Sequence, residues 1–86
     1  MYHYEDMKLT LFTEKGTVLF TAIRDKTREL LSKAGAARAQ EMMHTNLGGD
    51  SWVMLACLDR LVELREVREI TVQSEVAGQH RVFVST

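Results

Sequence analysis

The chain has 86 residues, of which 45% are hydrophobic and 27% charged, and its formal net charge is −1. This length fits one domain that buries roughly 60–65% of its unfolded surface, and the composition is that of a folded domain, which excludes intrinsic disorder. The sequence has no apolar run of about 18 residues that would predict a membrane span, and its near-neutral charge excludes a strongly basic nucleic-acid-binding arm.

The N-terminal part of the chain allows two interpretations. Lys8–Phe12 alternates polar and apolar residues, which predicts a strand, and Thr17–Thr21 is rich in β-branched and aromatic residues. A loop with Gly16 at a positive φ would join them into a hairpin. The competing interpretation makes Thr13 an N-cap and runs one helix over Glu14–Lys33. Because glycine and β-branched residues are weak helix formers, we favour the strand at Lys8–Phe12 and leave the next segment open.

Three helices are predicted in the middle of the chain, because apolar residues recur there at helical spacing. They cover Ala22–Ala34, Ala36–Leu47 and Ser51–Leu64. The pair Gly48-Gly49 ends the second helix, and Asp50 or Ser51 is the N-cap of the third. Since only about three or four residues separate these two helices, they should cross sharply, as in a helix-turn-helix.

Two strands are predicted at the C-terminal end, Glu69–Gln73 and His80–Ser85, joined by an exposed, mobile loop at Ser74–Gln79. One face of this hairpin should pack on the helices. The residues expected on that face are Ile70, Val72, Val82 and Val84. Arg81 is expected on the opposite face, exposed to solvent.

Three helices, a tight turn and a closing hairpin resemble the winged helix-turn-helix superfamily. The resemblance covers residues 22–85, about three quarters of the chain. It is carried by Asn46-Leu47-Gly48 and by Leu58-Asp59-Arg60-Leu61-Val62-Glu63-Leu64-Arg65-Glu66-Val67-Arg68-Glu69-Ile70. The latter segment is similar to a third helix ending in Leu-x-x-Leu, a short bend and a first wing strand. The family's bend is often a glycine, and here Arg65 or Glu66 stands in its place.

The resemblance implies an α+β fold for the single domain 1–86. Residues 22–86 would form the three-helix winged helix-turn-helix with a C-terminal β-hairpin wing. Residues 1–21 would form an N-terminal strand or hairpin extension.

The superfamily's usual partner is duplex DNA, so the resemblance implies a small DNA-binding transcriptional regulator of the bacterial type. In such proteins the exposed N-terminal face of the third helix enters the major groove. The residues that would contact DNA are Arg38, Ser51, Trp52, Arg60, Gln79, His80 and Arg81.

A second hypothesis is a protein-interaction or dimerisation module on the same fold, without DNA binding. The start of the third helix lacks the Arg, Lys, Asn and Gln side chains that read bases, and it carries acidic residues. Exposed Trp and Val side chains mark protein interfaces more often. The candidate interface residues are Trp52, Val53 and Ala56, and the partner would be a second copy or another protein. An open alternative is that Trp52 packs against the second helix as a core residue.

No constellation in the sequence predicts catalysis or metal binding. His3, His44 and His80 lie on three separate segments without metal-ligand spacing, and Cys57 is expected to be a buried core residue. We therefore expect neither an enzyme nor a metal or small-molecule cofactor. Because the N-terminus lacks the basic and apolar stretches of a signal peptide, we expect a cytoplasmic location.

Overall fold

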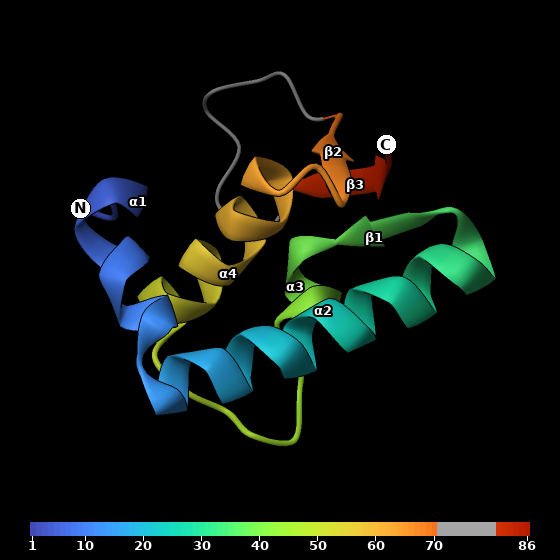
Figure 1. Ribbon diagram of the computed structural model, residues 1–86. Coiled ribbons are helices and arrows are strands. Elements are labelled where there is room, and N and C mark those ends of the chain that lie inside the picture. Colours follow the sequence, from blue (N-terminus) through green and yellow to red (C-terminus); the bar gives the residue numbers. More distant parts are fainter. Residues whose placement is uncertain (71–80) are drawn as a thin grey trace.

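The computed structural model describes residues 1–70 and 81–86 and confirms the predicted α+β class (Figure 1). In chain order the elements are α1 (Tyr4–Met7), the 3-10 helix η1 (Lys8–Phe12), α2 (Glu14–Ala34), β1 (Ala36–Arg38), α3 (Ala39–Met42), α4 (Ser51–Glu63), β2 (Val67–Glu69) and β3 (Val82–Ser85). The strands form an antiparallel sheet in the order β1-β3-β2.

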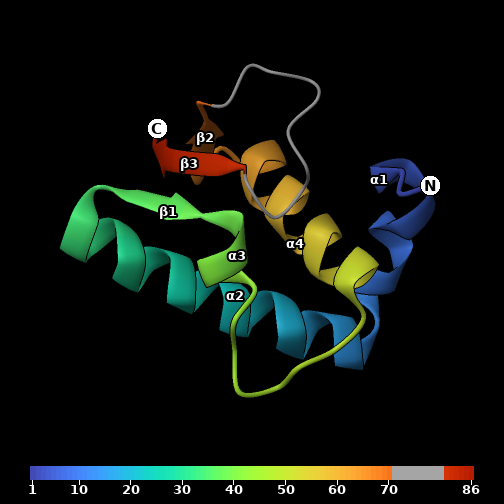
Figure 2. The same ribbon diagram turned by 180° about the vertical axis from the view of Figure 1, so that it is seen from behind.

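Helices α2 and α4 begin at the same end of the molecule and diverge toward the sheet (Figure 1; Figure 2). Strand β1 runs back along the C-terminal half of α2, and the N-terminal α1 lies beside α4. The hydrophobic core lies between α2, α4 and the sheet. Its largest fully buried side chains are Ile23, Thr27, Met42, Cys57, Leu58, Leu61 and Phe83. The buried Thr27 hydroxyl donates to the Ile23 carbonyl at 2.7 Å, so this polar group has a partner.

The predicted strand at Lys8–Phe12 is wrong, because these residues form η1 and the chain then enters a long helix. The competing interpretation is confirmed: Thr13 is the N-cap of α2, and its hydroxyl accepts from the Gly16 amide at 3.0 Å. Buried residues of α2 fall at Gly16, Leu19, Ile23 and Thr27, one helical face. Residues Thr17–Thr21 are therefore helical despite their strand propensity, because the burial of one face of α2 outweighs that propensity.

The predicted second helix, Ala36–Leu47, is wrong in extent. Its first residues form β1 and pair with β3, Ala36 opposite Val84 and Arg38 opposite Val82. Only Ala39–Met42 is helical, so α3 and α4 are joined by the eight residues 43–50 rather than by a tight turn. The reason is tertiary: β3 offers a hydrogen-bonding edge to this segment, and Gly35 at a φ of 75° turns the chain toward it.

The third predicted helix is confirmed as α4. Asp50 is its N-cap, and the carboxylate accepts from the Trp52 amide at 2.7 Å. Its fully buried residues are Ala56, Cys57, Leu58 and Leu61, so the expected burial of Cys57 is confirmed, whereas Leu64 at its end is exposed.

Both C-terminal strands exist, with different bounds and a different face. Strand β2 begins at Val67, two residues before the predicted start, and Phe83 is the residue of β3 with no exposed surface. Val82 and Val84 are only half-buried and Ile70 is exposed, so the predicted inward face is wrong by one residue. Val72, Gln79, His80 and the predicted wing loop Ser74–Gln79 lie outside the described residues.

Candidate functional site

The start of α4 presents fewer residues to a partner than the sequence predicts. Ser51 is exposed, Trp52 retains 44% of its surface and Val53 is half-buried. Trp52 is therefore not a core residue. Ala56 is completely buried, so its assignment to an interface is wrong. One turn beyond Trp52, the helix already faces the core on this side.

Arg38 and Arg60 are each held by a neighbouring carboxylate. The Arg38 guanidinium lies 3.0 Å from Glu41, and Arg60 donates to Glu63 while it also covers the ring of Phe12 at 5.3 Å. A phosphate would have to compete with these carboxylates for either cation.

Arg81 lies inside an ion-pair network, contrary to the expectation that it projects freely from the sheet. Its guanidinium donates to both carboxylate oxygens of Glu69, at 3.0 and 2.7 Å, and to Asp59 of α4 at 2.6 Å. Only 16% of the side chain is exposed. Burial alone would lower the pKa of Arg81, but the hydrogen bonds to Glu69 and Asp59 outweigh it and raise that pKa. The physical reason is the strand face: Arg81 shares the inward side of β3 with Phe83, whose ring it covers at 5.1 Å.

A second polar cluster joins the N-terminal segment to α4. The Tyr2 hydroxyl donates to Asp59 at 2.5 Å, and Tyr4 and Lys8 both donate to Glu63 at 2.9 Å. Burial and then the hydrogen bond to Glu63 raise the pKa of Tyr4 to about 12. Hydrogen bonds from Lys8, Arg60 and Tyr4 lower the pKa of Glu63 to about 2. The sequence alone does not predict this cluster, because Tyr4 and Lys8 are more than 50 positions away from Glu63.

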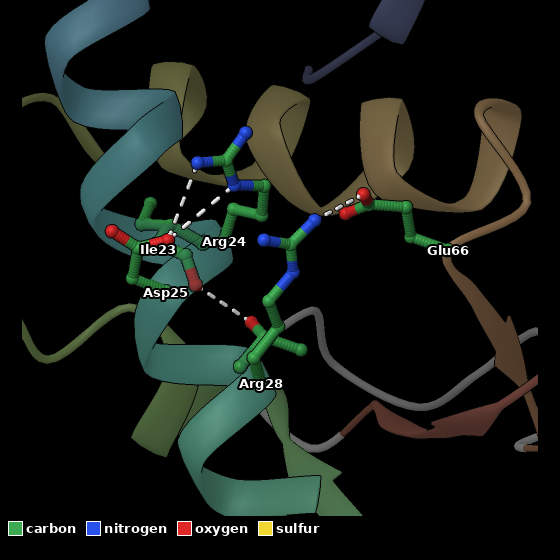
Figure 3. Close-up of polar contacts among 6 residues, drawn as sticks. Ile23, Arg24, Asp25, Arg28 and Glu66 are labelled. Atoms are coloured by element: carbon green, nitrogen blue, oxygen red, sulfur yellow. Dashed lines mark hydrogen bonds and ion pairs between the residues drawn. The ribbon is translucent and has the colours of Figure 1, made fainter.

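Most of the 11 Lys and Arg side chains lie against a carboxylate. Those in ion pairs are Lys8, Arg24, Arg28, Lys33, Arg38, Arg60 and Arg81. Figure 3 shows one that joins two elements, Arg28 of α2 with Glu66 after α4, at 2.7 Å. Among residues 1–70 and 81–86, the cations without an ion pair are Lys15, Lys26, Arg65 and Arg68. Positive charge on the described surface is therefore largely neutralised.

A groove of about 700 Å³ opens where the first turns of α2 and α4 meet the 43–50 segment. Its apolar lining is Val18, Leu19, Leu47 and Val53, and its polar rim includes Glu14, Lys15 and Asp50. Val18 and Leu47 remain 53% and 55% exposed, so the lining is open to solvent. The sequence does not predict this groove, because its pattern leaves the segment that contains Val18 open between strand and helix and places Leu47 at the end of a longer second helix.

Leu9 and Phe12 of η1 add to the exposed apolar surface at this end, at 76% and 58% exposure. Thr10 of the same 3-10 helix lines the groove together with Thr13. The same 3-10 helix thus carries exposed apolar side chains and a residue of the groove, and apolar surface gathered in one region marks binding sites more often than scattered apolar residues do.

Other chemistry has less support in the described part of the chain. Cys57 is fully buried, and burial raises the pKa of its thiol to about 12, far from that of a reactive cysteine. Residues 1–70 and 81–86 contain no cluster of His, Cys, Asp and Glu side chains that could hold a metal ion. Within the same residues, no helix has the length and apolar character needed to cross a membrane.

Comparisons with protein-family models, curated proteins and solved structures gave no match for this chain.

Proposed function

We propose that this chain is a protein-binding module on a winged helix-turn-helix scaffold. The order α2, α3, α4 followed by the antiparallel strands β2 and β3 supports that scaffold. The eight-residue connection between α3 and α4 departs from the tight turn of the resemblance. That departure matters for function, because Leu47 in this connection lines the groove.

The observation that carries the proposal is the apolar groove between the starts of α2 and α4. A partner side chain or helix that covers Val18 and Leu47 would remove two large exposed apolar side chains from water. Burying such a side chain contributes roughly 1.5–3 kcal/mol, so this small area could anchor a specific complex. Trp52 beside Val53 adds an aromatic residue of the kind that is enriched in interfaces.

DNA binding is the competing function, and the element order favours it as well. Its weakness is charge: the candidate phosphate contacts Arg38, Arg60 and Arg81 are all paired with carboxylates. Affinity for DNA depends mainly on cations that neutralise phosphates. Asp50 at the start of α4 would also repel the backbone.

A pair of matched variants tests the proposal. Leu47→Asp places a charge in the groove, and Leu64→Asp places the same charge at the far end of α4, where Leu64 is 46% exposed. We expect proteins retained from a cell extract by the wild type to be retained by Leu64→Asp and lost with Leu47→Asp. Identical retention by all three chains would contradict the proposal.

Duplex DNA is titrated in parallel at low salt, with Trp52 fluorescence as the signal. The expected result is no response at tens of micromolar, where non-specific DNA binders already respond. Binding that Arg38→Ala weakens and Leu47→Asp leaves intact would favour the DNA function instead.

A further inference from the structure

We infer that the groove between the starts of α2 and α4 binds the same surface of a second copy of this chain, in a two-fold symmetric dimer. This inference rests on the proposed protein-binding function and names the partner.

A two-fold interface places one patch against itself, so the patch must hold both a projection and a hollow that receives it. Leu9 and Phe12 are exposed and lie three residues apart on one face of η1, and Thr10 of the same 3-10 helix lines the groove. In a two-fold dimer, the projecting η1 side chains of each copy would cover Val18 and Leu47 of the other.

Glu14 and Lys15 are adjacent at the groove rim, and neither forms an ion pair within residues 1–70 and 81–86. The third charged rim residue, Asp50, keeps its negative charge, but its carboxylate already accepts from the Trp52 amide as the N-cap of α4. The Glu14–Lys15 part of the rim is self-complementary, because two-fold symmetry lets Lys15 of each copy face Glu14 of the other. A strongly basic or acidic partner would satisfy only one of these two charges.

The first test measures the association state by sedimentation equilibrium between about 1 μM and 1 mM, a range that covers moderate and weak dimers. We expect the wild type and Leu64→Asp to dimerise with the same Kd. Leu47→Asp should weaken association at least tenfold. Val18→Asp is the second groove variant, used if circular dichroism shows that Leu47→Asp does not fold.

A charge swap tests the rim. Lys15→Glu alone brings only acids together across the two-fold axis, and Glu14→Lys alone brings only cations together, so each variant should be a weaker dimer than the wild type. An equimolar mixture of the two restores opposite charges and should recover association as a heterodimer. Recovery in the mixture is specific to this pairing, since a loss of helix stability in either variant would persist there.

The dimer inference and the proposed function fail in different ways. A wild type that stays monomeric at about 1 mM overturns the dimer, and the proposed function stands if Leu47→Asp still loses captured proteins. A dimer that is insensitive to Leu47→Asp, Val18→Asp and both charge variants also overturns the inference, because it would use another surface.

Discussion

Arg81, which immediately precedes β3, connects that strand to Glu69 of β2 and to Asp59 of α4. The bidentate contact with Glu69 is the strong geometry for an arginine–carboxylate pair. Both partner carboxylates are themselves partly buried. Removal of the guanidinium would therefore leave two carboxylates without their main counter-charge.

We expect Arg81→Met to lower the free energy of unfolding by about 2–3 kcal/mol, since hydrogen bonds between charged, partly buried groups contribute that much. Urea unfolding followed by circular dichroism measures the change. The matched control is Arg38→Met, an exposed pair whose loss should cost about 0.5 kcal/mol or less. Equal losses in the two variants would show that Arg81 is no more structural than a surface arginine.

The sequence predicts which residues cap and end the helices, but not which side chains of β3 point toward the core. Asp50 as an N-cap follows from the residues beside it, and Gly35 ends α2 as glycine does at many helix ends. The face of β3 does not follow, because Val82, Phe83 and Val84 are all apolar and either face could be the inner one. The inward position of Arg81 depends on Asp59 and Glu69, which only the fold brings together.

At the scale of elements, η1 packs on the first turn of α2 across a glycine. A Cβ at Gly16 would lie 1.9 Å from the Thr10 carbonyl oxygen and 2.9 Å from the Leu11 Cα. These are backbone atoms, which cannot move aside as a side chain end does. The close approach also positions Thr10 and Thr13 at the groove.

Gly16→Ala should lower the free energy of unfolding by about 1–3 kcal/mol, the usual cost of overpacking, although alanine favours a helix by about 1 kcal/mol over glycine. Thermal or urea unfolding measures it. Ser32→Ala is the control on the exposed side of the same helix and should be neutral or slightly stabilising. A stabilised Gly16→Ala protein would mean that η1 is not held against α2 as described.

The sequence predicts an element correctly where its capping residues and its apolar spacing indicate the same structure, as in α4. It fails where pairing with a distant segment determines the backbone conformation. Residues 36–38 are helix formers by composition, yet they form a strand because β3 pairs with them. The groove was not predictable for the same reason. It depends on the short α3, which leaves Leu47 outside a helix, and on the long α2, which includes Val18.

Hydrogen bonds from Tyr2, Tyr4 and Lys8 to carboxylates of α4 hold the N-terminal segment against that helix. Glu63 accepts two of these bonds and one from Arg60. Because its pKa in the folded chain is lowered to about 2 from an ordinary 4.5, the unfolded chain binds more protons in this range. The contribution of Glu63 is therefore present above about pH 4.5 and is lost as the pH falls toward 2.

We expect stability to decline over this acid range, and Glu63→Gln to flatten that decline. The measurement is the urea midpoint as a function of pH for the wild type and the variant. Glu5→Gln is the control, because among the described residues the Glu5 side chain has no hydrogen-bond or ion-pair partner, and its curve should follow the wild type. Parallel curves for the wild type and Glu63→Gln would show that the cluster does not hold the N-terminal segment.

The order of the strands has a consequence for how the chain folds. The central strand β3 is the one that pairs with both β1 and β2, yet it comes after both in the sequence. During synthesis, β1 and β2 would emerge without the partner that completes their hydrogen bonding. Long-range pairing of this kind is slow relative to helix formation, and unpaired strand edges favour aggregation. We therefore expect the helices of the growing chain to form first and the sheet to form only when β3 has been synthesised.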